Sequence, residues 1–503
     1  MTSIYERITE YSRQGRFYDL IKILEEELLR VETQEETLEL KYQLAEAHYS
    51  VRDFNNSKKL IETILPSFNK LYNYSMVGHA ENLLGKIYRI HKRYIEALTH
   101  YQKAEKAFEQ TKDNEGLSKV YHNIGNAYVF LQRLKEAKKF HFRALEIAQH
   151  IGNSEAIAIS HLSIGSMFYQ NGEVDLALFH FDKARNLFEE VQNIPNLAAT
   201  YHNLAEVFLI RKKFTNALKS SSQAVSYYKK IENPLGQHLA LTTLARSAKS
   251  AGFLDQAIDA YNQAFSINPT EDILLELGES YLNQNQIENG RKVFERVLEL
   301  PTRTLRGEGY SLDYLAKIAI NEKDFDQALN IYFQLLEVLK KIKPHDPESI
   351  VSTQGNLGYM YLKIGNSKLA WEYLVQTCDY FKKKKIWNEL ITLGNNYRNE
   401  YVVRNDYKQA IILIRDIILP AVKKSQNKVL ENQYHYEVAL LNHIEGNTKE
   451  GLCYWEKYST QKIPFQRYPT FLLTTVEERT KISLEKHHQE FLKHISKKLE
   501  DNL

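Results

Sequence analysis

The sequence predicts an all-α solenoid of antiparallel helix pairs, because small residues recur along it in three regular series. Members of the first series stand 40 positions apart, at Ala45, Gly85, Gly125, Gly165, Ala205 and Ala245. The second series follows 12 positions later, at Ser57, Ala97, Ala137, Ala177, Ala217 and Ala257, and the third lies a further 7 positions on, at Ala104, Ala144, Ala184, Ala224 and Ala264. A fixed period of this length indicates stacked copies of one supersecondary motif.

The first series marks the first helix of each repeat, which we call helix A. Gly85 follows the apolar Leu84 and precedes the aromatic Tyr88 by three positions, and most other repeats keep this order. Apolar residues at this spacing form the buried stripe of an amphipathic helix. Because glycine within a helix costs roughly 1 kcal/mol relative to alanine, its recurrence indicates that a neighbouring helix packs closely against this position.

The second and third series mark the second helix, helix B. A large residue usually lies between their small members, as Tyr101, Phe181 and Tyr261 do. Two helices approach to about 8–10 Å only where the side chains at the crossing are small. Each repeat is therefore predicted as helix A, a short turn, helix B and a connection to the next helix A.

These residues resemble the tetratricopeptide repeat. The pattern Leu84-Gly85-x-x-Tyr88 with Ala97, Tyr101 and Ala104 fits the family, and the repeat that starts near Leu244 matches it through Pro269. The resemblance implies a right-handed superhelix. The 40-residue period is similar to that of spindle-orientation adaptors, kinesin light chains and Rap-type bacterial regulators. It implies a protein that binds peptides or partner proteins in a superhelical groove.

The regularity of the repeat divides the chain into four predicted regions. Residues 1–36 are interpreted as a degenerate N-terminal capping repeat and residues 37–269 as the regular 40-residue array. Residues 270–467 form a less regular array with shorter spacing, and residues 468–503 are predicted to be amphipathic capping helices. Their expected role is to cover the apolar face of the final repeat. Self-association or docking through these helices is the second possibility.

Composition argues against several classes of protein. The 66 basic and 63 acidic residues give a net charge of only +3, which does not suit a general nucleic-acid binder. Two cysteines are too few for a disulfide framework. The first residues carry no evident signal peptide, and no apolar run reaches the roughly 20 residues that span a bilayer. We expect a cytoplasmic protein without membrane insertion.

Catalytic motifs are absent from the sequence. It contains no phosphate-binding glycine loop, nucleophile elbow or zinc-protease motif. His487, His488 and His494 cluster near the C-terminus, but no carboxylate or thiol completes a zinc-like set, so they are interpreted as surface residues. The chain is predicted not to be an enzyme and to need no cofactor or metal.

The tetratricopeptide resemblance implies that helix A lines the groove, mainly three and two positions before the small residue and one and four after it. Polar side chains there suit the backbone of an extended peptide, because an amide both donates and accepts hydrogen bonds. The candidate binding residues are Tyr42, Glu46, Tyr49, Asn82, Lys86, Arg89, Lys119, His122, Asn123, Asn126, Ser166, Tyr169, His202, Asn203, Glu206, Arg246 and Lys249.

Three functions remain open at this stage. The favoured one is a non-catalytic adaptor or scaffold that binds a protein or peptide in the groove. The second is a regulator in which a bound peptide changes the superhelix and thereby its affinity for another protein. The third is a structural subunit of a larger assembly, which a broad exposed apolar patch would indicate.

Overall fold

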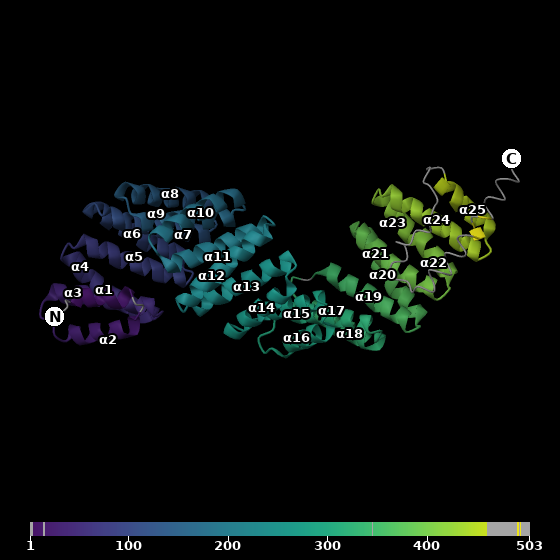
Figure 1. Cartoon of the computed structure of the whole chain (residues 1–503), viewed down its shortest axis with the longest axis horizontal. Helices are drawn as coiled ribbons and strands as arrows, with labels where there is room; N and C mark the ends of the chain where they lie inside the picture. The colour runs from purple at the N-terminus through teal and green to yellow at the C-terminus, as the bar shows by residue number, and fades with distance from the viewer. Residues whose placement is uncertain (1–3, 14–15, 345, 460–489, 492, 494–503) are drawn as a thin grey trace. The chain divides into compact units, whose positions relative to one another are not determined.

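All regular secondary structure in the computed structural model is helical over the residues that it describes, which are 4–13, 16–344, 346–459, 490, 491 and 493. The chain divides into two compact units, Met1–Pro269 and Thr270–Leu503. Figure 1 labels the helices of both. The predicted all-α solenoid of helix pairs is confirmed in each. Residues 460–489, which include most of the predicted capping helices with His487 and His488, lie outside the described residues, as does His494.

Helices A and B of the first unit alternate along the chain, with helix A bearing the odd numbers from α3 onward. Sequential helices pack against each other throughout the unit. Its helices are α1 (Ile4–Arg13), α2 (Phe17–Leu28), α3 (Gln34–Ser50), α4 (Phe54–Lys70), α5 (Tyr74–Ile90), α6 (Tyr94–Thr111), α7 (Asn114–Phe130), α8 (Leu134–Ile151), α9 (Ser154–Gln170), α10 (Val174–Glu190), α11 (Ile194–Ile210), α12 (Phe214–Lys230), α13 (Pro234–Ala251) and α14 (Leu254–Ile267).

The second unit continues the helix pairs with less regular lengths. Tyr436 and Trp455, on the last two helices named below, lie against the buried Phe491, a member of the region predicted to form the cap. Its elements are α15 (Glu271–Asn283), α16 (Ile287–Glu299), α17 (Leu305–Asn321), α18 (Phe325–Lys341), α19 (Pro347–Lys363), α20 (Ser367–Lys384), α21 (Trp387–Val403), α22 (Tyr407–Leu413), the π-helical segment η1 (Ile414–Ile418), α23 (Leu419–Lys424), α24 (Lys428–Ile444) and α25 (Thr448–Ser459).

The turns of the first unit repeat as strictly as its small residues. One left-handed residue ends each helix A, at Arg52, Lys92, Gln132, Gly172, Lys212 and Gly252. Another ends each of the helices α4, α6, α8, α10 and α12, at Tyr72, Lys112, Gly152, Gln192 and Glu232. The residue after each of the latter caps the next helix A with its side chain, which accepts a backbone N–H: Asn73, Asp113, Asn153, Asn193 and Asn233. These caps satisfy an otherwise orphaned donor at each helix start.

The first series of small residues lies where a ring from helix B packs on helix A. A Cβ added to Gly85 would lie 2.4 Å from Tyr101, and one added to Gly165 would lie 2.6 Å from Phe181. Gly278 in the second unit faces Phe294 in the same way, at 2.6 Å. Steric contact with this ring therefore explains why glycine recurs there despite its low helix propensity.

Replacing Gly165 with alanine should lower the free energy of unfolding by about 1–2 kcal/mol. Overpacking a tight core costs roughly 1–3 kcal/mol, and the better helix propensity of alanine returns up to about 1 kcal/mol. Urea denaturation followed by circular dichroism measures the loss. Gly309→Ala on α17 is the control, because its Cβ would meet nothing closer than 3.6 Å and should not destabilise. Equal effects of the two substitutions would contradict the steric explanation.

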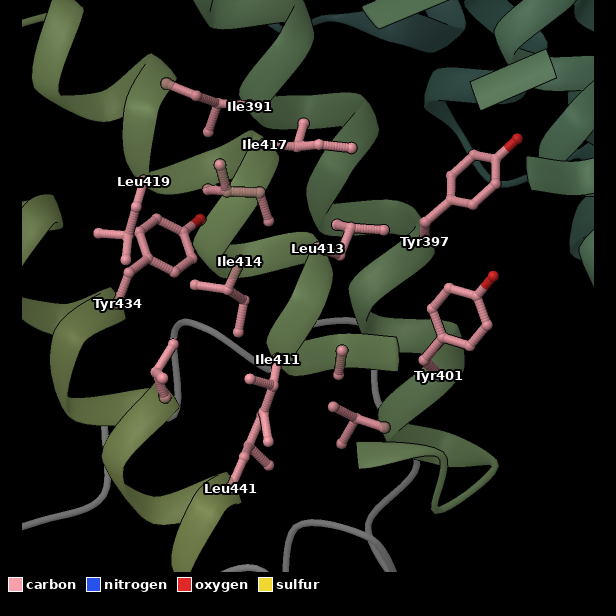
Figure 2. Close-up of a cluster of buried hydrophobic side chains, with 14 of the residues drawn as sticks. Ile391, Tyr397, Tyr401, Ile411, Leu413, Ile414, Ile417, Leu419, Tyr434 and Leu441 are labelled. Atoms are coloured by element: carbon pink, nitrogen blue, oxygen red, sulfur yellow. The ribbon is translucent and has the colours of Figure 1, made fainter. Parts of the chain in front are cut away.

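A large apolar cluster forms the core of the second unit around η1. The N–H of Leu419 bonds to the carbonyl of Ile414, five residues back instead of four. Pro420 explains this change, because proline lacks an N–H and its ring clashes with the carbonyl four residues earlier. Figure 2 shows the buried side chains that α21, α22, η1, α23 and α24 contribute: Ile391, Tyr397, Tyr401, Ile411, Leu413, Ile414, Ile417, Leu419, Tyr434 and Leu441.

Candidate functional site

Three adjoining cavities lie along helices α3, α5, α7 and α9 of the first unit. Their volumes are about 540, 350 and 240 Å³, and Lys86 on α5 lines all three. Glu46 on α3 lines two of them. Because they share these side chains, the cavities form one groove, which we call the α3–α9 groove.

Eight of the predicted binding residues line this groove. The other nine lie on helices α5, α7, α9, α11 and α13, outside these three cavities. The lining residues are Tyr42, Glu46, Tyr49, Asn82, Lys86, Lys119, His122 and Asn123. The others are Arg89, Asn126, Ser166, Tyr169, His202, Asn203, Glu206, Arg246 and Lys249.

Several predicted residues hydrogen-bond to one another between successive A helices. The amide of Asn123 donates to the Oδ1 of Asn82 over 2.9 Å, and both side chains are almost fully buried. Ser163 Oγ lies 3.1 Å from His122 Nδ1. In both pairs the later residue lies two positions before its small residue and the earlier one three positions before, so we call these contacts the polar rungs. Each rung uses hydrogen-bonding groups of these side chains that would otherwise be available to a ligand.

The same geometry continues towards α13. Thr243 Oγ1 lies 3.5 Å from His202 Nδ1 and donates a 2.7 Å hydrogen bond to Glu206. Arg246 Nη1 donates to the same carboxylate over 3.1 Å. Glu206 and Arg246 thus neutralise each other across α11 and α13. This part of the predicted site is an ion-pair network between repeats.

Positive charge gathers at the centre of the α3–α9 groove. Burial, with the nearby Arg89 and Lys86, lowers the pKa of His122 to about 4, so its imidazole is neutral at pH 7. Burial also lowers the pKa of Lys86. Glu46 opposes this shift, and Lys119 and Arg89 add to it. Arg89 Nε is buried and forms no hydrogen bond within the described residues. Lys86 and Lys119 line the groove and can attract an acidic group, whereas Arg89 lines none of the three cavities.

Carboxylates flank this positive centre along the groove. Glu46 lies on one side, and Glu115 and Glu155 line the cavity on the other. Lys119 Nζ bonds to Glu115 over 2.6 Å. Alternating charges with amides and tyrosine rings offer hydrogen bonds and flat contact surface to a polypeptide. Within the described residues no group of three His, Cys, Asp or Glu side chains could hold a metal ion.

Sequence reasoning missed residues at the starts of the A helices that also line the groove. Glu115 and Glu155 stand 40 positions apart, each two residues after its capping residue. Asn153, itself a cap, lines the same cavity. The recurring Asn or Asp caps are visible in the sequence and could have located these positions.

Comparison with known proteins agrees with these repeats. Family models described as tetratricopeptide repeat match residues 116–190 and 242–303. The chain contains tetratricopeptide repeats. The predicted resemblance is thereby confirmed for these segments, which contain the whole of helices α8, α9, α10, α14, α15 and α16.

Two curated relatives share part of this chain. It is 23% identical to the transcriptional activator NprA of Geobacillus stearothermophilus over 231 residues, which are 44% of this chain and 55% of NprA. It is 28% identical to the BBSome complex member BBS4 of Bos taurus over 141 residues, which are 28% of this chain and 25% of BBS4. The chain thus spans about half of the first relative's length and a quarter of the second's.

Solved structures with similar helix pairs are more distant. The apo form of the quorum sensor NprR from B. thuringiensis aligns with a TM-score of 0.41 and 15% identity, covering 69% of this chain and 98% of that one. A signal transduction ATPase with a tetratricopeptide repeat sensor from Pyrococcus horikoshii aligns with a TM-score of 0.48 and 18% identity, covering 58% and 47%. No described helix has the length and hydropathy needed to cross a bilayer.

Proposed function

We propose that this chain is a non-catalytic adaptor that binds a peptide or an extended segment of a partner protein in the α3–α9 groove. The observation that carries the proposal is the continuity of the groove, since Lys86 lines all three cavities. An extended segment needs a binding surface that spans several repeats. Amides, carboxylates, cations and tyrosines line this one.

The polar rungs divide the predicted residues by role. Asn82 and Asn123 are nearly buried and hydrogen-bond to each other, so they serve chiefly to hold α5 beside α7. Lys119 is exposed, whereas Lys86 is partly buried at the centre. Ligand contact therefore falls mainly to Lys86, Lys119, Glu46 and Tyr49. A ligand would fit this charge pattern if its acidic side chain lay beside Lys86 and its basic side chains lay beside Glu46 and Glu115.

Removing the two groove lysines tests the proposal. Peptides are first selected from a random displayed library on the intact chain, and fluorescence anisotropy then measures their affinity. Lys86→Ala/Lys119→Ala should weaken binding about tenfold or more, because hydrogen bonds to charged groups contribute roughly 1.5–3 kcal/mol. Circular dichroism confirms that the variant is folded.

The control removes the same charge from exposed positions on helix B. Lys135→Ala/Lys219→Ala changes α8 and α12 outside the groove and should leave affinity unchanged. If the selected peptides bind both double variants as tightly as the parent, or if selection yields no binding peptide, the groove is not the binding site.

The polar rungs support a second candidate, a peptide-responsive regulator. They join A helices of successive repeats, so a ligand that competes for His122 or Ser163 would alter the contact between α7 and α9. The partial similarity to a transcriptional activator is compatible with this function. Addition of a selected peptide would then change the hydrogen-exchange rates of α7 and α9 beyond the groove contacts, whereas a passive adaptor would change only the contacted positions.

A further inference from the structure

A basic pocket lies in the second unit, apart from the α3–α9 groove. Its volume is about 440 Å³, which lies in the range of small-molecule sites. We call it the α23–α25 pocket, since η1, α23, α24 and α25 enclose it. The lining residues are Arg415, Leu419, Pro420, Lys423, Lys424, His435, Tyr454 and Lys457.

The π-helical segment places one wall of this pocket. Arg415, Leu419 and Lys423 are four residues apart, so they lie on one face of the helix that runs through η1 into α23. Tyr454 and Lys457 are three residues apart on α25 and share a face there. His435 contributes from α24, with its ring centroid 5.8 Å from that of Tyr454.

Positive charge predominates in the α23–α25 pocket. Four lining side chains are cations, and none of the eight is acidic. The neighbouring carboxylates are bound by basic side chains. Asp416 accepts two bonds from Arg415, at 2.7 and 2.9 Å, and Glu431 lies 3.9 Å from Lys423 and 3.3 Å from Lys428. Glu450 also acts on Arg415 electrostatically. Among the described residues, five cations therefore stand against three carboxylates around the pocket: Arg415, Lys423, Lys424, Lys428 and Lys457 against Asp416, Glu431 and Glu450.

His435 offers a buried polar atom that the protein itself does not satisfy. Its side chain is 9% exposed, and its Nδ1 has no hydrogen-bond partner in the part of the chain that the structure describes. Its Nε2 lies 3.8 Å from Glu431 Oε1. Burial lowers the pKa of this imidazole, and Lys423 and Lys457 lower it further. A buried nitrogen without a partner costs roughly 1–3 kcal/mol, which a bound ligand could recover.

We propose that the α23–α25 pocket binds a small organic polyanion through its phosphate groups. Lysine suits phosphate oxygens as a point charge, and arginine offers five N–H donors. The two bonds from Arg415 to Asp416 come from Nε and Nη2 and not from Nη1, which is the group that we assign to a phosphate oxygen. Leu419, Pro420 and the ring of Tyr454 give an apolar surface for the organic part of the ligand. The volume exceeds what a single phosphate needs. The pocket is independent of the proposed peptide groove.

Isothermal titration calorimetry on the full chain tests this inference with tripolyphosphate and ATP as probes. Both should bind, and ATP should bind more tightly if the apolar wall contacts its base and ribose. Binding should weaken as salt rises, since exposed charges are screened. Lys423→Ala/Lys457→Ala should weaken both by about tenfold or more, in line with lost hydrogen bonds to a charged ligand.

Two further variants make the test specific. Lys383→Ala/Lys384→Ala removes the same charge from exposed positions on α20 and should leave binding unchanged. His435→Phe keeps the ring volume but removes both nitrogens, so it should weaken tripolyphosphate binding without lowering the melting temperature. The inference is overturned if neither probe binds at physiological salt or if the pocket and α20 variants bind equally. Binding of hexaglutamate but of neither phosphate probe would instead assign the pocket to an acidic peptide.

Discussion

Replacing Arg398 with methionine should lower the free energy of unfolding of the second unit by about 3–5 kcal/mol, the usual cost of leaving a buried charge without its partner. Arg398 on α21 is 1% exposed and Glu437 on α24 is fully buried. Nη1 of Arg398 donates a 2.8 Å bond to Oε1 of Glu437, and Nη2 donates to Asn395 over 3.0 Å. The substitution leaves the carboxylate of Glu437 buried without its counter-charge.

The loss should depend on pH. Burial raises the pKa of Glu437 even beside Arg398. A raised pKa means that the native state accepts a proton more readily than the unfolded chain, so its stability falls as pH rises through the native pKa. Without Arg398 that effect grows. The difference between parent and variant should therefore be larger at about pH 8 than at about pH 5.

A double variant separates the charge effect from simple loss of packing. Arg398→Met/Glu437→Met removes both charges, and apolar replacements of buried pairs are often close to neutral in stability. Urea denaturation of the parent, both single variants and the double variant measures the coupling. If the double variant loses the sum of the two single losses, the ion pair does not account for the effect.

Acid should destabilise the first unit, with His141 as the main contributor. Its ring is fully buried on Gly125, and both nitrogens lack hydrogen-bond partners within the described residues. Burial, helped by His122, lowers its pKa to about 3. The unfolded chain takes up this proton first, so stability is complete above the ordinary pKa of about 6.5 and declines below it. The shift corresponds to up to about 5 kcal/mol at the acid limit.

Another repeat supplies the substitution that tests this effect. Phe181 lies on Gly165 as His141 lies on Gly125, so His141→Phe places a ring that this site accepts elsewhere. The variant should be more stable than the parent by about 1–3 kcal/mol at neutral pH, because two unsatisfied nitrogens disappear. Its melting temperature should also fall less between about pH 7 and pH 5.

Thermal denaturation across that pH range measures the change. His150→Gln is the control, because His150 is exposed on the same helix, α8, and its loss should leave the pH dependence as it was. A parallel pH dependence in the parent and His141→Phe would show that other groups cause the acid loss. His122 and His180, whose pKa values are each lowered to about 4, would then be the next residues to replace.

The helix pairs could be predicted because close packing requires small residues at fixed positions, and these residues can be recognised in the sequence. A glycine such as Gly85 is recognisable where a ring such as Tyr101 must pack, and the spacing between them locates both helices. The positions that line the α3–α9 groove could be predicted in part from the repeat spacing, since eight of the candidate binding residues line it. That Asn82 would bond to Asn123 could not be predicted, because it depends on how closely α5 and α7 approach.

The α23–α25 pocket shows a second limit. Pro420 signals a disturbance of the helix, but the sequence alone does not reveal that the helix continues through η1 and turns Arg415 and Lys423 to one side. His435 and Lys457 join them only through the packing of α24 and α25. Basic residues from separate helices therefore form one site, and no local sequence motif predicts it.

The identical turns of the first unit bear on how such a chain could lengthen during evolution. Every block from one left-handed residue to the next of its kind, such as Arg52 to Lys92 or Lys92 to Gln132, begins and ends in the same backbone conformation. Duplication of a gene segment that encodes one such 40-residue block would join two chain ends of the same backbone conformation. The inserted block would meet the neighbours for which its surfaces are already shaped, so binding surface could be added without redesigning the rest of the protein.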